Sequence, residues 1–525
     1  MTATLDRPPP APDTPSWRDR LQPATAGRNP LVGWLAALGV GLLAGILRFV
    51  RLDLPAGRIF DEVYYSCDAQ NLLRFGVETQ ILTDPDDDTV IARCEPLPSE
   101  AGSFIAHPPL GKWLIALGIR LFGADELGWR FAAALAGTVT VVVLVRMARR
   151  MTGSTVLGAL AGLLLAVDGL HFVQSRVAML DVFLVLWTTS AAACLVADRD
   201  TVRSRLARAD GDALTGWGPR LGLRPWLVAA GLCLGAAVAT KWSGLYFVAV
   251  LGLLALAWEV GARRAAGVAA PVRATLVRST APLAGLLLLL PTVVYTSSWA
   301  GWFAGDSGWS RQWGEQNAAS GALAGLVPDA LRSLWHYHGE IFRFHDDLAD
   351  SHPYQSSPAS WLVLARPVSY YYPQDVGPGD YGCTAASCAR EVLAIGTPAL
   401  WWVAVAALLL LTWKWAAHRD WRAGAVVLLA LTPIVPWIRD DLDGRTMFLF
   451  YALPAVPFLA LAVALVAGWA VGDGQTRTRR RVATAVAGGH LALVVANFSW
   501  LYPVLAAQTI PYAAWYSRMW FPSWI

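Results

Sequence analysis

Residues 446–471 have the sequence TMFLFYALPAVPFLALAVALVAGWAV, a run that contains no charged side chain. A helix needs about 20 predominantly apolar residues to cross the hydrocarbon core of a bilayer. Similar blocks recur along the chain of 525 residues, of which 55% are hydrophobic and only 15% are charged. A soluble chain of this length would divide into domains with charged surfaces. The sequence therefore predicts an all-α polytopic membrane protein.

About eleven apolar blocks are expected to be transmembrane helices, although several of them are short or rich in glycine. They cover residues 31–50, 127–146, 154–170, 177–197, 225–240, 242–260, 280–298, 396–413, 423–438, 446–471 and 482–502.

The distribution of arginine predicts the orientation, because cytoplasmic loops carry an excess of Lys and Arg. Segments 146–153, 261–279 and 472–481 are rich in Arg and almost free of Asp and Glu. Residues 53–106 instead hold eleven Asp or Glu against three Arg, and residues 299–395 hold ten against five. We therefore expect the N-terminus and the Arg-rich segments in the cytoplasm, and both acidic loops outside the cell membrane.

This orientation divides the chain into five parts. Residues 1–30 contain seven Pro and are expected to form a disordered cytoplasmic tail. The remaining parts are an N-terminal transmembrane module at 31–298 with a first outer loop at 51–126, a second outer loop at 299–395, C-terminal transmembrane helices at 396–502 and an extracytoplasmic tail at 503–525.

The cysteines agree with exported loops. Cys67 and Cys94 share the first outer loop, and Cys383 and Cys388 share the second. An even pair in each loop predicts two disulfides in an oxidising compartment, with free thiols as the alternative.

The pair Asp61-Glu62 is the first candidate for a site, within the sequence RIFDEVYY at residues 58–65. It follows the first apolar block closely, so it is expected near the outer membrane surface. Adjacent carboxylates point in different directions, which permits one to react while the other holds a partner. A solvated acidic pair in an acidic loop is the alternative.

The motif HPPLGK at residues 107–112 precedes an amphipathic run, Trp113–Phe122. Two prolines favour an extended approach followed by the start of a helix. The run suits a helix that lies in the membrane interface, with Lys112 near the lipid head groups. His107 and Lys112 are candidates for a substrate groove, and a purely interfacial helix is the alternative.

Three cations, Arg130, Arg176 and Lys241, are expected near the outer edge of the apolar blocks. A buried or interfacial cation needs an anionic partner. That partner is either a protein carboxylate such as Asp181 or the phosphate of a lipid-linked substrate. Their convergence favours a phosphate, with Asp181 as a further candidate for the groove.

Half of the eight histidines lie in the second outer loop, at positions 336, 338, 345 and 352. Their spacing does not match a zinc template such as His-Glu-x-x-His. We expect His338, His345 and His352 to pack this loop or to line a polar groove, with a metal site as the alternative. The turn at residues 439–445 holds two Arg and three Asp and is expected to be joined by salt bridges.

At these residues the chain resembles the protein O-mannosyltransferase family, in its actinobacterial branch. The matching motifs are FDE at 60–62, HPPLGK at 107–112, QSR at 174–176, LD at 180–181, TKWSGL at 240–245, WHYH at 335–338, SHPYQS at 351–356 and the stretch 361–372. They occur in order from about residue 45 to residue 500, so the resemblance covers nearly the whole chain.

The resemblance implies a GT-C membrane fold with two long extracytoplasmic loops. It also implies transfer of mannose from polyprenyl-phosphate mannose to Ser or Thr hydroxyl groups of exported polypeptides, with coupling to the secretion channel as a further expectation. Eukaryotic members carry a β-trefoil domain in the second loop, and residues 299–395 are too few to contain it. No P-loop, dinucleotide motif or nucleic-acid-binding module is found in the sequence.

The chemistry suggests a role for each candidate. A sugar phosphate has a good leaving group, whereas a hydroxyl is a poor nucleophile that gains from a carboxylate base. Asp61 is expected to be that base, as the family motif also implies, and Glu62 to orient the acceptor or the cation pocket. Arg130, Arg176 and Lys241 are expected to hold the lipid phosphate. Direct attack predicts inversion at the sugar carbon and requires no metal or other cofactor.

Three other functions compete with this interpretation. The first is another GT-C glycosyltransferase that uses a lipid-phosphate sugar. The second is a transporter of lipid-linked sugars, which favours internal repeats and ionisable residues near the middle of the membrane; neither is evident. The third is a structural partner in secretion, which gives no reason for carboxylates and cations to converge.

Overall fold

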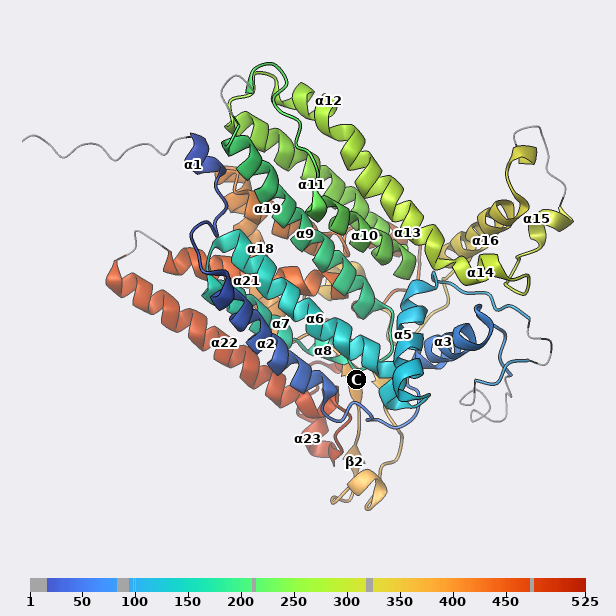
Figure 1. Cartoon of the computed structure of the whole chain (residues 1–525). Helices are drawn as coiled ribbons and strands as arrows, with labels where there is room; N and C mark the ends of the chain where they lie inside the picture. Colours follow the sequence, from blue (N-terminus) through green and yellow to red (C-terminus); the bar gives the residue numbers. More distant parts are fainter. Residues whose placement is uncertain are drawn as a thin grey trace, which may run out of the picture.

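The computed structural model describes residues 17–82, 94–97, 99, 101–209, 214–317, 324–472 and 476–525. Within them, eight helices are long and apolar enough to cross a membrane (Figure 1). They are α2 (Pro30–Phe49), α6 (Glu126–Thr152), α9 (Asp181–Ala207), α11 (Gly244–Ala265), α18 (Pro398–His418), α22 (Arg477–Leu505) and two composite helices, Pro271–Ser298 and Leu449–Val471. Three shorter apolar helices accompany them, α7 (Thr155–Ala166), α10 (Pro225–Thr240) and α19 (Trp421–Leu431). Each predicted block coincides with one of these helices, so the helical membrane fold is confirmed, while the number of crossings stays a prediction.

Prolines account for the two composite helices. Pro271–Ser298 joins α12 (Pro271–Ala284), the π-helical turn η2 (Gly285–Leu289) and α13 (Leu290–Ser298). Leu449–Val471 joins the 3-10 helix η5 (Leu449–Ala455) and α21 (Val456–Val471). Pro282 and Pro291 flank η2, and Pro454 lies inside η5. Because proline lacks a backbone N–H, it favours such irregular turns within an otherwise continuous helix.

Polar caps end the apolar blocks. The carboxylate of Asp125 accepts a hydrogen bond from Gly128 N at 2.9 Å where α6 begins. Gly153, with a φ of +72°, closes the far end of α6, and Ser154 accepts from Leu157 N at 3.3 Å to start α7. These caps satisfy backbone groups that a helix end leaves unpaired. The chain therefore reverses within two residues between two packed helices.

The two ends of the bundle differ (Figure 1). One, the loop end, carries α3 (Glu62–Phe75), α5 (Leu110–Phe122), α14 (Ala300–Ala304), α15 (Trp313–Gln316), α16 (Asp329–Asp346) and the C-terminus. The other, the arginine-rich end, carries the turn after α11 and the start of α22. There Arg149, near the end of α6, donates to the carbonyl of Asn29 beside α2 at 2.8 Å. The described parts of the acidic loops and the Arg-rich segments thus lie at opposite ends.

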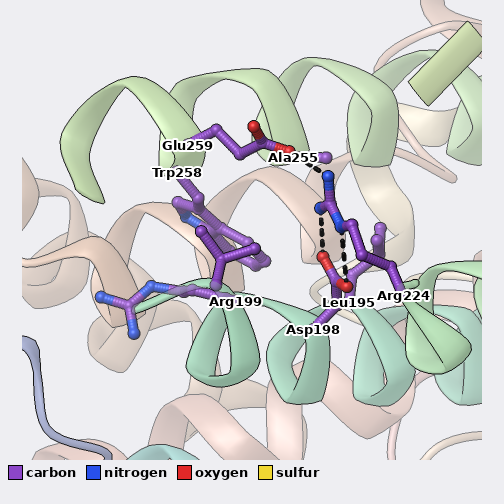
Figure 2. Close-up of a pocket in the computed structure, with 8 residues that line it drawn as sticks. Leu195, Asp198, Arg199, Arg224, Ala255, Trp258 and Glu259 are labelled. Carbon is purple, nitrogen blue, oxygen red and sulfur yellow. Dashed lines mark hydrogen bonds and ion pairs between the residues drawn. The ribbon is translucent and has the colours of Figure 1, made fainter. Parts of the chain in front are cut away.

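Helices α9 and α10 pack against each other in opposite directions and share an ion pair at each end. At the loop end, Lys241 Nζ lies 3.0 and 2.9 Å from the two carboxylate oxygens of Asp181. At the arginine-rich end, Arg224 Nε donates to Asp198 at 3.0 Å, Nη2 donates to the same carboxylate, and Nη1 donates to Glu259 of α11 (Figure 2). Asp198 follows Asp181 by 17 residues, so the two ion pairs lie about 25 Å apart along the helix.

A small cavity lies beside the Arg224 cluster (Figure 2). Its volume is about 10 Å³, which leaves room for about one water molecule. Its lining comes from Leu195, Asp198, Arg199, Val202, Arg224, Ala255, Trp258 and Glu259. The cluster is therefore an internal ion network that joins three helices, and it is too small to bind a substrate.

Two short antiparallel sheets, which the sequence did not predict, order the second loop at the loop end. Strand β1 (Val368–Tyr371) pairs with β3 (Val392–Ala394), and β2 (Cys388–Ala389) pairs with β4 (Ile510–Pro511). The remaining short elements are α8 (Gly169–Gln174), η3 (Ala324–Leu326), α17 (Pro358–Trp361), η4 (Asp380–Gly382), α20 (Trp437–Leu442), α23 (Tyr512–Tyr516) and η6 (Pro522–Trp524). Both predicted disulfides, Cys67–Cys94 and Cys383–Cys388, are present.

The predicted disordered tail at residues 1–30 needs a correction over its second half. Residues 1–16 lie outside the described residues. Residues 17–30 are described, and they include α1 (Trp17–Leu21). Leu21 is fully buried in a cluster with Val202 and Leu206 of α9. This apolar contact, which a count of prolines could not reveal, orders the chain ahead of α2.

Candidate active site

Asp61 lies at the N-terminal end of α3, in the turn that follows α2. The preceding residue, Phe60, has a φ of +52°, a left-handed conformation that a bulky residue rarely adopts. The Phe60 ring stacks on Tyr370 of β1 at a centroid distance of 4.3 Å, which holds the turn against the second loop. Within the described residues, the Asp61 carboxylate accepts one side-chain hydrogen bond, from the Tyr65 hydroxyl at 3.4 Å. Its oxygens therefore keep lone pairs for a further donor.

The environment of Asp61 favours proton uptake near neutral pH. Burial is the largest effect and raises the pKa of Asp61 to about 6. Lys241 acts in the opposite direction on this pKa, and Asp181 raises it further. The structure thus brings Asp61 close to the Lys241–Asp181 ion pair at the loop end. A carboxylate with this pKa is suited to accept the proton of a hydroxyl group.

Glu62, in contrast, is fully buried and occupied by protein donors. Its Oε1 accepts from Arg130 Nε at 2.8 Å and from Ala178 N at 2.8 Å. Its Oε2 accepts from Arg130 Nη2 at 2.8 Å and from Ile59 N at 3.0 Å. No side of this carboxylate is left for a substrate. Glu62 therefore orients the Arg130 guanidinium, which is one of the two roles expected for it, and ties α3 to α6 and to the segment before α9.

Arg130 is not available as the predicted phosphate ligand. Besides the two bonds to Glu62, its Nη1 donates to the carbonyls of Leu52 and Pro55 at 3.2 and 2.8 Å. Its Nη2 also donates to the carbonyl of Gly57 at 2.9 Å. A guanidinium has five N–H donors, and all five are used here. Arg130 therefore organises the turn between α2 and α3.

Arg176 also departs from its predicted role. Its Nη1 donates to the carbonyls of Arg48 and Val50 at 2.8 Å each, and its Nη2 donates to the carbonyl of Arg51 at 2.6 Å. These carbonyl groups lie at and beyond the end of α2, where a helix leaves its last carbonyls unpaired, and that of Arg51 also accepts from Leu54 N at 3.2 Å. A cation is also favourable at a helix C-terminus. Arg176 is thus a cap of α2, and its contact with a phosphate stays a prediction.

Lys241 holds both oxygens of Asp181, the carboxylate named as its alternative partner. Asp181 itself is 2% exposed and serves as this partner, so it does not line a groove as predicted. The Lys241 ammonium also lies 5.6 Å from the ring centroid of Tyr451. Of the three predicted cations, Lys241 is the one that remains beside Asp61.

Two of the predicted histidines meet near this pair. The rings of His107 and His345 stack at a centroid distance of 5.3 Å, and Tyr65 lies 6.4 Å from His107. His345 Nε2 donates to the carbonyl of Ala106 at 2.9 Å. Burial is the largest cause that lowers the pKa of His107 and the pKa of His345, the latter to about 4. Both imidazoles are therefore neutral at physiological pH.

The other groove candidates have partners of their own at the edge of this cluster. Lys112 is only 1% exposed, and its Nζ pairs with Glu78 at 2.6 Å and with Asp68 at 3.4 Å. The predicted position of Lys112 among lipid head groups is therefore wrong, because α5 turns this residue towards the acidic first loop. His338 is hydrogen-bonded to the Tyr295 hydroxyl at 2.6 Å, and the His352 ring packs on Phe448 at 5.0 Å.

Three members of the cluster were missed from the sequence, Tyr370, Tyr451 and Arg445. Arg445 had been placed in a salt-bridged turn, and within that turn it is Arg439 that faces Asp443, at 3.8 Å. Arg445 instead donates from Nε to the carbonyl of His345 at 2.9 Å. The available signal was its position, since an Arg directly before an apolar block at the loop end needs an anionic or polar partner. Among the residues that the structure describes, no group of three or more His, Cys, Asp or Glu side chains could hold a metal ion.

Comparison with known proteins identifies the family of this chain. Residues 122–298 match the family model of dolichyl-phosphate-mannose-protein mannosyltransferases, and residues 330–524 match that of the C-terminal four-transmembrane region of protein O-mannosyltransferases. The chain is 41% identical over 505 residues to the polyprenol-phosphate-mannose–protein mannosyltransferase of Mycolicibacterium smegmatis, covering 94% of this chain and 93% of that protein. It is 40% identical over 507 residues to the Mycobacterium tuberculosis protein of the same name, covering 94% and 92%.

A solved structure shares the fold. The Saccharomyces cerevisiae protein O-mannosyltransferase Pmt1–Pmt2 complex bound to the sugar donor superposes with a TM-score of 0.70 at 15% identity, covering 96% of this chain and 93% of that chain. The GT-C fold expected from the sequence is thereby confirmed. With family models and relatives spanning almost the whole length, this chain belongs to the protein O-mannosyltransferase family and is a membrane glycosyltransferase.

Proposed function

We propose that this protein transfers mannose from polyprenyl-phosphate mannose to Ser or Thr hydroxyl groups of exported polypeptides. The relatives at 40% and 41% identity are named for this donor and for protein acceptors. The observation that carries the proposal is the contrast between two adjacent carboxylates. Both oxygens of Glu62 accept hydrogen bonds from Arg130, whereas the Asp61 carboxylate keeps free lone pairs. The pKa of Asp61 is raised to about 6 beside the Lys241–Asp181 pair.

The mechanism follows from that contrast. Asp61 accepts the proton of the acceptor hydroxyl as its oxygen attacks the anomeric carbon of the mannose. The bond from that carbon to the phosphate oxygen breaks, and polyprenyl phosphate leaves with the electron pair. Attack from the face opposite to the leaving group inverts the anomeric configuration, so a β-linked donor yields an α-mannoside. Cations near Asp61 stabilise the charge on the departing phosphate, and the scheme requires no metal or other cofactor.

The proposed location is the outer face of the cell membrane, with the N-terminus in the cytoplasm. The separation of the Arg-rich end from the loop end supports it, because Arg-rich segments favour the cytoplasmic side. The two disulfides at the loop end support it as well, since such bonds persist in oxidising compartments. Acceptors at that face would be polypeptides that leave the secretion channel.

The test is to incubate the purified protein with polyprenyl-phosphate mannose and a Ser/Thr-containing peptide, and to weigh the peptide. A hexose increment that is absent from a peptide with Ala at every Ser and Thr is the expected result. The anomeric configuration of the product, measured by nuclear magnetic resonance, should be α. An unchanged peptide, with movement of the lipid-linked sugar across vesicles, would instead support a transporter.

A further inference from the structure

The cations near Asp61 differ in how many of their donors the protein already uses. Arg130 has all five donors bonded to protein oxygens, two of them to the Glu62 carboxylate. Lys241 holds both oxygens of Asp181. Each of these two charges is therefore balanced by a buried carboxylate. An anionic substrate would have to compete with that carboxylate for either of them.

Arg445, between α20 and η5, has a different set of contacts. Its Nε donates to the carbonyl of His345 at 2.9 Å, and its Nη2 lies 3.4 Å from His345 Nδ1. Because His345 Nε2 donates to Ala106, Nδ1 is the acceptor of the neutral ring. Arg445 Nη1 is buried and has no hydrogen-bond partner within the described part of the chain. No ion pair between Arg445 and a described carboxylate is found either.

The Arg445 side chain is partly exposed, but its Nη1 atom is buried. A buried donor without an acceptor is costly, because it has lost its water, so the missing partner of Nη1 points to a ligand. Aromatic rings supply part of the stabilisation here. The Arg445 guanidinium lies 5.0 Å from the ring centroid of Trp437 and 6.0 Å from that of Tyr451. Neither ring carries a negative charge, so no countercharge for Arg445 is found among the residues that the structure describes.

Tyr451 places Arg445 next to the reacting groups. The same ring lies 5.6 Å from the Lys241 ammonium. Arg445 and Lys241 both act to lower the pKa of His107, after burial, and that imidazole stacks on His345. Arg445 and the Lys241–Asp181 pair therefore contact the same Tyr451 ring.

We infer that Arg445 binds the phosphate anion of the lipid-linked donor through Nη1, with its orientation fixed by the backbone and imidazole of His345. The phosphate supplies both the missing acceptor and the missing countercharge. A guanidinium with an unused N–H is well suited to a phosphate oxygen. The inference rests on the proposed function, because that donor contains the phosphate. It moves the principal phosphate contact away from Arg130 and Arg176 to a residue in the second half of the chain.

Two variants and one control test it. R445Q removes the charge, and R445K keeps the charge without the planar donor set. R439Q is the matched control, because Arg439 lies on the same turn with a side chain that is 88% exposed. For each variant, the KM for polyprenyl-phosphate mannose and the KM for the peptide are measured separately. The dissociation constant of polyprenyl phosphate itself is measured by native mass spectrometry, without any transfer reaction.

R445Q should raise the donor KM and the dissociation constant of polyprenyl phosphate by about 10- to 100-fold, as expected for a lost hydrogen bond to a charged group. R445K should show a smaller increase, and the peptide KM should change little in both variants. R439Q should match the wild type. Equal rises in donor and peptide KM, or unchanged binding of polyprenyl phosphate to R445Q, would overturn the inference. If the wild type bound polyprenyl phosphate through Arg445 but transferred no hexose, the proposed function would fail while this site would stand.

Discussion

At the residue scale, two neighbours with the same functional group are driven into opposite roles. Glu62 points into the protein and accepts four hydrogen bonds, from Arg130 and from backbone amides. Asp61 lies near enough to the Lys241–Asp181 pair for both charges to act on its pKa, and it accepts one long bond from Tyr65. Because side chains one position apart in a helical turn face different directions, adjacency in sequence is compatible with this division. The pair thus combines a reactive carboxylate with a buried anchor.

Replacing Asp61 by Asn should lower turnover by about 10²- to 10⁴-fold, because the general base is lost while its shape is kept. The protein should remain as abundant and as thermally stable as the wild type, since Asp61 makes one weak hydrogen bond in the described structure. Turnover is measured with donor and peptide at saturation. Activity within about threefold of the wild type would remove Asp61 from the mechanism.

The activity should also depend on pH through the raised pKa of Asp61, which is about 6. The base is active when it is deprotonated, so kcat/KM should level off above about pH 6 and fall about tenfold per pH unit below it. Asp68 is a competing explanation, because burial raises the pKa of its carboxyl to about 6 as well. The D68N variant should keep the acidic limb of the profile. A limb with its midpoint near pH 4 would contradict the environment described for Asp61.

The Glu62–Arg130 pair should behave as a stability element. E62Q keeps the size of the side chain but leaves the buried guanidinium without a countercharge. Breaking a buried pair in this way costs about 3–5 kcal/mol, so the thermal midpoint in detergent and the abundance in membranes should both fall. D61N serves as the contrast, since it should leave both quantities unchanged. If E62Q were as stable as the wild type but inactive, Glu62 would regain the catalytic role predicted from the sequence.

At the element scale, α9 and α10 form a pair that is clamped at both ends. Lys241 and Asp181 join them at the loop end, and Arg224 joins Asp198 and Glu259 at the other (Figure 2). One clamp therefore lies beside the reacting groups, while the other lies about 25 Å away. The Arg224 cluster therefore fixes the packing of the two helices that carry Lys241 and Asp181.

R224Q should lower the thermal midpoint strongly, because it leaves two buried carboxylates without their cation. The donor KM of the surviving folded protein should stay within about twofold of the wild type, given the distance to Asp61. The triple variant D198N/R224Q/E259Q removes all three charges and should be more stable than R224Q alone. A donor KM that rises with R224Q as much as with R445Q would show that the arginine-rich end takes part in donor binding.

At the scale of the whole molecule, the orientation can be tested with introduced cysteines. Arg439 is exposed at the loop end, and Arg481 is exposed near the start of α22. In intact cells, R439C should react with a membrane-impermeant maleimide, and R481C should react only after lysis. The wild type is the control, because four of its cysteines form disulfides and Cys194 and Cys233 lie within apolar helices. The reverse labelling pattern would invert the proposed topology.

The fold was largely predictable because the length of an apolar block reports directly on membrane crossing. The short sheets were not, since strand β2 has two residues and its partner β4 comes from the C-terminal tail. The order of residues 17–30 was missed for a related reason, because Leu21 is ordered by a distant contact with α9. Depth in the membrane is encoded locally, but such pairings between distant segments are not.

The candidate site was likewise predictable only in part. Charged residues near the ends of apolar blocks identified Asp61 and Lys241, because their cost in that environment marks them. The sequence could not say that Arg130 faces Glu62, since a helix that is apolar on most sides gives little clue to which face points inward. It placed Lys112 on an amphipathic helix but could not show that this face packs on Glu78. The sequence also placed Arg445 in a salt-bridged turn without showing that it faces His345. The sequence therefore indicated which charged residues lie near the membrane surface, but not which way their side chains point.

The double clamp between α9 and α10 also limits how the chain can adapt to bilayers of other thickness. The intervals Asp181 to Asp198 and Arg224 to Lys241 are both 17 residues long, so the two charged positions are equally far apart along each helix. One residue inserted between the two charged positions of one helix would rotate the second of them by about 100° and shift it by about 1.5 Å. A thicker membrane therefore demands that both helices lengthen together, by whole numbers of turns.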